Sequence, residues 1–223
     1  MTGSIAQRIT EIRQQLPESV RLIAVTKQVP VDAMREAYVA GVRDFGESRI
    51  QEAELKQTQL LDLPDITWHL IGHLQSNKAR KALEIFQWIH SLDSLKLAQR
   101  LDELAAGQPS KPHVCLQVKL LPDANKSGWT VPELLADLPS LDQCSNLQIQ
   151  GLMTIPPLDL DSSEILAVFD RTRELADKIR QQNWLNIHIQ QLSMGMSADY
   201  QQAVQAGATM IRLGRIIFGE RMT

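Results

Sequence analysis

The sequence predicts an α/β protein built on a single (β/α)8 barrel, with one extra helix ahead of the first strand. Short apolar runs alternate with amphipathic stretches along the whole chain, and eight such runs occur. Most are rich in Val, Ile and Leu, as parallel strands buried on both faces should be. A doubly wound open sheet is the alternative, but sheets of that kind normally use about five to seven strands.

The expected strands and helices follow one another in chain order. The strands are residues 21–26, 43–47, 66–72, 88–93, 113–120, 147–155, 186–194 and 210–218. Several helical patterns end in glycine, a common helix stop. They cover residues 4–16, 31–41, 49–61, 76–84 (the weakest pattern), 93–107, 131–138, 161–182 and 197–207. No stretch resembles an interdomain linker, so residues 1–223 are expected to form one domain.

Composition narrows the class of protein. The 223 residues are 43% apolar and 22% charged, with a net charge of −3 and a pI of about 6.0. Without a basic field, we expect no nucleic-acid or anionic-membrane partner. The first residues lack the apolar core of a signal peptide, and no apolar run approaches the roughly 20 residues of a membrane span. Together with two cysteines in no metal-like spacing, these features predict a soluble cytoplasmic protein.

Lys27 ends the apolar run of the first strand, in RLIAVTKQVP (21–30). Chemistry in (β/α)8 barrels collects at the carboxyl ends of strands. Partial desolvation and a nearby cation favour a neutral amine, which can attack an aldehyde, and Arg212 on the last strand could supply that cation. The alternatives are a solvated lysine at a strand end and a structural ion pair of Arg212 with Glu47 or Asp93.

The segment 192–220 predicts a phosphate site. A Ser/Gly loop opens a helix after the seventh strand, at the place where barrels often bind phosphate. Ser193 adds a hydroxyl, the helix start near Ser197 offers backbone N–H groups, and Gly214 lets another N–H approach. The alternative is a capped helix followed by a strand with a bulge. A lysine facing a phosphate site also allows a cofactor-free Schiff-base aldolase acting on a phosphorylated sugar.

Histidines offer little support for a metal site. His69 and His73 lie four apart, on or just past the third strand, and share a face. No Cys or carboxylate cluster accompanies them, so we expect no bound metal. His90 and His113 are expected to be strand histidines with satisfied hydrogen bonds, and Cys115 to lie in the core.

A series of short motifs runs in order from about residue 5 to the C-terminus. The motifs are AVTK (24–27), FGES (45–48), WHLIGHLQSNK (68–78), HSLDS (90–94), LQVKL (116–120), KSG (126–128), GLMTIP (151–156), LSMGMSADYQQAVQAGATMIRLG (192–214) and IFGER (217–221). Together they resemble the pyridoxal-phosphate homeostasis proteins, also called the YggS or PROSC family. The resemblance implies a fold similar to the barrel domain of alanine racemase and eukaryotic ornithine decarboxylase, with pyridoxal 5′-phosphate (PLP) as the cofactor.

The resemblance also implies roles for particular residues. Lys27 would form the internal aldimine with PLP, and Arg212 matches the arginine that alanine racemase places on the pyridine nitrogen. The phosphate would be bound by Ser193 and the backbones of Gly214 and Arg215, and Met194 is also expected among the cofactor-binding residues. Two positions depart from the family pattern: Ser48 replaces the usual Asn, and His73 replaces the usual Pro, so contacts at these positions do not carry over.

The function implied by the resemblance is a non-enzymatic carrier of PLP that delivers the cofactor to apo-enzymes and influences amino-acid and keto-acid pools. The chain is expected to lack the second, β-rich domain that gives alanine racemase a tyrosine acid/base and dimer contacts, so we expect a monomer. Its tyrosines, Tyr38 and Tyr200, fall in helical stretches. An arginine at the pyridine nitrogen leaves the ring unprotonated and a weaker electron sink. The alternative is a PLP-dependent enzyme, such as an amino-acid racemase, that uses Lys27 as its base.

Overall fold

The parallel strands of the chain close into a ring. The computed structural model describes residues 3–123 and 125–220. Within them, eight strands pair in the order β1-β2-β3-β4-β5-β7-β8-β9, and β9 pairs back to β1. Their bounds are β1 Arg21–Val25, β2 Asp44–Glu47, β3 Thr67–Leu70, β4 Trp88–Leu92, β5 His113–Lys119, β7 Gln148–Met153, β8 Ile187–Ser193 and β9 Met210–Leu213. Each strand lies inside a predicted run, so the predicted barrel is confirmed and the open sheet was the wrong alternative.

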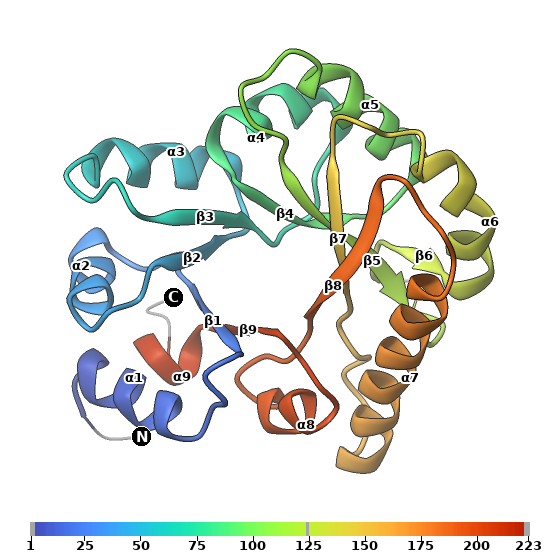
Figure 1. The fold of residues 1–223 in the computed structure, drawn as a ribbon. Helices are drawn as coiled ribbons and strands as arrows, with labels where there is room; N and C mark the ends of the chain where they lie inside the picture. Colours follow the sequence, from blue (N-terminus) through green and yellow to red (C-terminus); the bar gives the residue numbers. More distant parts are fainter. Residues whose placement is uncertain (1–2, 124, 221–223) are drawn as a thin grey trace.

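Helices surround the ring and connect consecutive strands (Figure 1). They are α1 Ile5–Gln14, α2 Val31–Val39, α3 Ile50–Gln59, η1 Ser76–Lys78 with α4 Ala79–Ile85, α5 Leu95–Ala105, α6 Val131–Leu141, α7 Ser162–Arg180, α8 Tyr200–Gln205 and α9 Arg215–Phe218. The extra helix α1 precedes β1, as predicted. In the part of the chain that the structure describes, no helix is both long and apolar enough to cross a membrane. Because all strands of the ring are parallel, their carboxyl ends open on one face, the mouth of the barrel.

Two short elements differ from the prediction. The apolar run 210–218 was predicted to be one strand, but β9 stops at Leu213 and the last residues form the helix α9. A short apolar run does not distinguish a strand from a buried helical turn, which explains the error. The strand β6 (Trp129–Thr130) was not predicted; it pairs with β5 outside the closed ring.

Reciprocal capping boxes fix where the helices α1, α6 and α7 begin. Ser4, Thr130 and Asp161 each accept a backbone N–H of the first helical turn, and a Gln or Glu three residues later reaches back to the cap. Such caps are worth about 1 kcal/mol each. The caps of α6 and α7 also explain why these helices begin where the sequence placed them.

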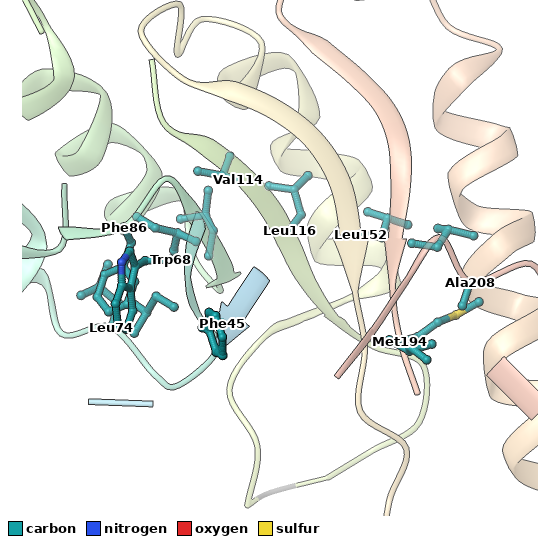
Figure 2. Close-up of a cluster of buried hydrophobic side chains, with 14 of the residues drawn as sticks. Phe45, Trp68, Leu74, Phe86, Val114, Leu116, Leu152, Met194 and Ala208 are labelled. Carbon is teal, nitrogen blue, oxygen red and sulfur yellow. The ribbon is translucent and has the colours of Figure 1, made fainter. Parts of the chain in front are cut away.

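Apolar side chains form two layers, one on each side of the sheet. The larger layer packs between the strands and the helices, and Figure 2 shows part of it. The smaller layer lies inside the ring and consists of Ile23, Trp88, Cys115, Met153 and Met210. Because side chains alternate along a strand, the residues two and four places further on also point inward. The inward set therefore includes polar residues near the mouth.

Candidate functional site

Lys27 lies just past the carboxyl end of β1, at the mouth of the barrel. The strand before it is buried from Leu22 to Val25, Thr26 is fully buried, and Lys27 is partly exposed. Lys27 lines a cavity of about 600 Å³. This volume falls within the range of about 300–1,000 Å³ that is typical of small-molecule sites. The structure therefore places the lysine at a ligand-sized cavity.

A buried network of charged side chains holds the turn after β1. Lys56, on α3, donates to the carbonyl oxygen of Thr26 (2.6 Å) and to Oε1 of Glu47 (2.8 Å). It also donates to Oε1 of Glu52 (2.6 Å). Thr26 Oγ1 donates to Glu47 Oε1 (2.7 Å), and the Gln28 N–H donates to Glu52 Oε1 (2.5 Å). The network thus anchors the backbone on both sides of the residue between Thr26 and Gln28.

The turn carries local backbone strain. Gln28 has φ +61°, and it is the one non-glycine residue with positive φ in the described part of the chain. A side chain in this region costs about 1–2 kcal/mol, and such residues persist where the surrounding structure over-determines them. Here the hydrogen bond to Glu52 and the neighbouring network supply that constraint, so the backbone on either side of Lys27 is held in place.

The two carboxylates of the network differ in charge environment. Burial raises the pKa of Glu47, because the hydrogen bonds from Lys56 and Thr26 do not fully offset it, and its Oε2 is buried without a hydrogen-bond partner. Burial also pushes up the pKa of Glu52, but the hydrogen bonds from Lys56 and the Gln28 N–H outweigh it and lower the pKa overall. The environment therefore favours the charged form of Glu52 and disfavours that of Glu47, although Lys56 contacts both.

The sequence reasoning did not single out Lys56 or Glu52. The signal was present, since the buried positions of α3 are Ile50, Ala53 and Lys56, each three residues apart. A lysine on the apolar stripe of a helix needs a buried acceptor. Glu47, at the end of the preceding strand, was the obvious one.

Across the mouth, the cavity is lined by the segment after β8 and the start of α9. Ser197, Gly214 and Arg215 face it. The Ile216 N–H donates to Ser197 Oγ at 3.4 Å, which is long for a hydrogen bond. A hydroxyl, a glycine and the first N–H groups of a helical turn form a setting that favours an anion. A second cavity of about 690 Å³ shares Gly214 and Arg215 and extends between the β1–α2 turn and α9.

Arg212 forms the floor of the cavity. Its side chain is buried (4% exposed), with Nη1 donating to Ser193 Oγ (2.6 Å) and Nη2 to the carbonyl oxygen of Thr154 (3.1 Å). Burial lowers the pKa of Arg212 to about 10, against the raising influence of Asp199, so the guanidinium stays charged at neutral pH. Arg212 does not form the ion pair with Glu47 or Asp93 that the sequence allowed. Glu47 bonds to Lys56, and Asp93 contacts His73.

Two residues expected at the cofactor lie outside the cavity. Ser193 is fully buried, and its hydroxyl contacts Arg212 and Nδ1 of His90 (2.7 Å). Met194 is also fully buried and belongs to the outer apolar layer, where Figure 2 shows it beside Ala208. β8 ends at Ser193, so the loop that lines the cavity starts only after Met194, and Ser197 is the serine that lines it.

The two departures from the family pattern lie on the rim of the mouth. Ser48 lines the Lys27 cavity and also a smaller neighbouring one of about 210 Å³ that includes His73. His73 is exposed, and its Nδ1 lies 2.9 Å from Asp93 Oδ2 and 3.2 Å from Ser127 Oγ. Because Asp93 and Ser127 contact the same ring nitrogen, they do not form a relay through the imidazole.

The histidines do not converge on a metal site. His69 is buried inside the ring, where Nε2 contacts Asp44 and Nδ1 contacts His90, while His73 points to the rim. In the described residues no group of three or more His, Cys, Asp or Glu side chains could hold a metal ion. Cys115 is fully buried, as expected.

The residues at the mouth fit PLP in chemical type. One cavity combines the amine of Lys27, the buried cation of Arg212 and an anion-favouring wall at Ser197, Gly214 and Arg215. These are the groups required for an aldehyde, a ring nitrogen and a phosphate. The buried Arg212 forms no ion pair with a carboxylate of the described residues, so its charge is available to a ligand.

Comparison with known proteins agrees with this geometry. The family described as alanine racemase, N-terminal domain, matches residues 2–222. The fold and site thus define a barrel of the alanine racemase type. The pyridoxal phosphate homeostasis protein of Synechocystis sp. is 53% identical over 213 residues (96% of this chain, 97% of the relative). The protein of the same name from Escherichia coli (strain K12) is 34% identical over 231 residues (98% and 97%). The chain belongs to the pyridoxal phosphate homeostasis protein family.

Solved structures give the same result. PipY of Synechococcus elongatus PCC7942, with PLP bound, superposes with a TM-score of 0.92 at 54% identity, covering 97% of this chain and 100% of PipY. Alanine racemase of Clostridium difficile 630 superposes with a TM-score of 0.77 at 15% identity, covering 99% of this chain and 57% of the racemase. The second likeness shows the barrel fold alone.

Proposed function

We propose that this protein binds PLP at the barrel mouth and acts as a non-enzymatic carrier in PLP homeostasis. In this proposal residues 1–223 are one cytoplasmic PLP-binding domain that works as a monomer and passes the cofactor to apo-enzymes. The observation that carries it is one cavity lined by both Lys27 and the buried Arg212. Membership of the homeostasis family and the PLP held by the related PipY support the choice of ligand.

Each wall of the cavity has a role in this proposal. When bound, PLP supplies an aldehyde that a lysine amine captures reversibly. Lys27 would hold the cofactor through its Nζ, and hydrolysis would release it. Arg212 would donate an N–H to the ring nitrogen, and its charge keeps that nitrogen unprotonated. The phosphate would contact Ser197 and the backbone of Gly214 and Arg215, in place of the Ser193 expected from the sequence.

The positions of the tyrosines favour a carrier over a racemase. Tyr38 lies on α2, where its hydroxyl contacts Asp65 and its ring lies under Arg43. Tyr200 is buried, and its hydroxyl donates to Gln15 Oε1 (3.0 Å). Neither tyrosine lines a cavity that contains Lys27. The acid/base pair that a racemase of this fold uses would therefore need another partner for the lysine.

The test is to trap the cofactor. Purified protein is titrated with PLP, the visible absorption spectrum is recorded before and after borohydride, and the pyridoxyl peptide is mapped by mass spectrometry. We expect a band that reduces to an adduct on Lys27 and that is absent in Lys27→Ala. The matched control is Lys126→Ala, because Lys126 also lies near the cavity, donating to the carbonyl oxygen of Pro156 (2.6 Å). An adduct on another lysine, or no band, refutes the proposed site.

Carrier and enzyme are then separated by two assays. A carrier restores activity to an apo PLP-enzyme at the rate at which it loses its own band, and it leaves the enantiomers of added amino acids unchanged. Racemisation that disappears in Lys27→Ala would establish the enzyme alternative. Turnover of a phosphorylated sugar by protein without PLP would revive the aldolase alternative.

A further inference from the structure

A continuous chain of hydrogen bonds crosses the inside of the barrel. Arg212 Nη1 donates to Ser193 Oγ (2.6 Å), and Ser193 Oγ lies 2.7 Å from His90 Nδ1. His90 Nε2 lies 2.9 Å from His69 Nδ1, and His69 Nε2 lies 2.8 Å from Asp44 Oδ1. Arg212 is at the mouth, whereas Asp44 begins β2 and so lies at the opposite end of the ring.

For neutral histidines, the two ends of this chain fix the direction of every hydrogen bond in it. An arginine only donates and a carboxylate only accepts. His69 therefore carries its proton on Nε2, donates to Asp44, and accepts at Nδ1 from the Nε2–H of His90. His90 then accepts at Nδ1 from the hydroxyl of Ser193, whose oxygen accepts from Arg212. The two neutral histidines thus share one tautomer.

The charge environment agrees with neutral histidines. Burial lowers the pKa of His69, although Asp44 opposes the shift, and burial with the neighbouring His69 lowers the pKa of His90 well below its usual value. Neighbouring cations and rings act in the same direction: Arg21 lowers the pKa of both histidines, His113 that of His69, and Arg212 that of His90. The rings of His69 and Trp88 stack with a centroid distance of 6.0 Å, and Cζ of Arg21 lies 5.6 Å from the centroid of the Trp88 ring.

We propose that Asp44, His69, His90 and Ser193 form a relay that positions Arg212 for its ligand. The relay holds Nη1 toward the interior of the barrel, so that the guanidinium presents a fixed edge to the cavity. It also contacts the cation through neutral groups, with the carboxylate of Asp44 at the far end beside Arg21. A carboxylate in direct contact would occupy N–H groups and neutralise the charge that a ligand at the mouth meets. The relay stands on the geometry; PLP as its ligand rests on the proposed function.

Ser193 thereby acquires a different role from the one its position in the sequence indicated. It is a positioning residue: its oxygen accepts from Arg212, and its hydroxyl donates to His90. No backbone group could replace it in that step without shifting β8, since the Ser193 backbone is already paired with β7 and β9.

The first experiment tests the relay in PLP-free protein. Long-range ¹H–¹⁵N NMR of histidine-labelled protein reports the tautomer of each ring. We expect His69 and His90 to be neutral with the proton on Nε2 across the neutral pH range. His113 is the internal control: its Nδ1 lies 2.9 Å from Gln150 Oε1, an acceptor, so His113 should carry its proton on Nδ1. A charged His90, or a proton on its Nδ1, overturns the relay.

The second experiment tests coupling along the relay. Ser193→Ala removes the group that donates to His90 Nδ1. We expect the change to reach His69, which does not contact Ser193, as a mixture of tautomers in PLP-free protein. The control is Thr172→Val, which removes another fully buried hydroxyl, one that donates to the carbonyl oxygen of Val168 (2.9 Å). If Ser193→Ala and Thr172→Val show the same His69 tautomer, Ser193 is not coupled to His69, and that result refutes the coupling.

The third readout is ligand affinity. Ser193→Ala removes a hydrogen bond to the charged Arg212. Its loss should weaken PLP binding roughly tenfold or more, with little change in Thr172→Val. Equal affinity for PLP in Ser193→Ala and the unmodified protein would show that the relay does not serve the ligand. If the unmodified protein fails to bind PLP, the proposed function fails, whereas the NMR result decides the relay independently.

Discussion

The sharpest test of the site is the substitution Lys56→Met, which removes the cation under the Lys27 turn while keeping the length of the side chain. Lys56 is only 7% exposed, and its Nζ contacts Thr26, Glu47 and Glu52 at 2.6–2.8 Å. Removing one member of a buried ion pair leaves an unpaired buried charge, which typically costs about 3–5 kcal/mol. We expect a loss of that size in the free energy of unfolding.

The loss should depend on pH in a direction set by Glu47. Burial already raises its pKa in the native state, so the native protein binds this proton more tightly than the unfolded chain. The stability contributed by such a group is fully present below the unfolded pKa and declines as the pH rises through the native pKa. In Lys56→Met the native pKa of Glu47 should rise further, because the hydrogen bond that lowers it is gone. The loss should therefore be larger at about pH 8 than at about pH 5, where a protonated Glu47 is less costly to bury.

Urea denaturation at the two pH values measures both effects. The control is Lys81→Met, because Lys81 also contacts two carboxylates, at 2.6 and 3.3 Å, but on the exposed surface. It should change the free energy of unfolding far less, since exposed pairs are weak. Lys56→Met should also weaken capture of PLP, because the turn carrying Lys27 loses its anchor. A loss no larger than that of the control, or one independent of pH, would refute the reasoning.

Two further predictions concern close packing and thiol chemistry. A Cβ at residue 72 would lie 2.3 Å from the carbonyl oxygen of Ser48, so Gly72→Ala should destabilise the protein by about 1–3 kcal/mol or more. Urea denaturation should show a larger loss than for Gly214→Ala, whose Cβ would meet its nearest neighbours only at 3.4 Å and whose φ is negative, and equal losses would contradict the clash. Burial raises the pKa of Cys115 to about 12 and that of Cys144 to about 11, so at neutral pH iodoacetamide should label native protein much more slowly than unfolded protein. Rapid labelling of the native protein would show that the thiols are accessible.

The strands were predictable because each is a short apolar run bounded by a turn, and the sheet buries both of its faces. Lys27 was predictable for the same reason, since the end of the run marks the end of the strand. The helix α9 was not, because RIIF satisfies the pattern of a buried strand as well as that of a buried turn. Only the pairing of β9, which stops at Leu213 beside Ala24, distinguishes the two.

The difference between Ser193 and Ser197 shows a limit of a different kind. Both serines lie in one loop motif, and the sequence does not say how far β8 extends into it. The register decides, because Met153 pairs with Ser193, so the strand ends one residue before Met194. Ser193 then points into the ring below the mouth, while Ser197 reaches the cavity. In the structure the hydroxyl of Ser193 contacts His90 and Arg212, and its predicted role at the phosphate stays a prediction.

Lys27 and Arg212, the two residues that would contact PLP, belong to adjacent strands and are held by separate hydrogen-bond networks. Lys27 follows β1 and is anchored from outside the ring by the network of Lys56, whereas Arg212 lies on β9 and is fixed from inside by the relay. The register pairs Ile23 with Arg212 and Ala24 with Leu213, so the sheet fixes the strand that leads to Lys27 relative to the strand that carries Arg212. A carrier needs this rigidity at the two ends of its ligand, because its own bond to the aldehyde must remain weak enough to reverse. Specific retention then has to come from preorganised polar contacts, since these lose little entropy on binding.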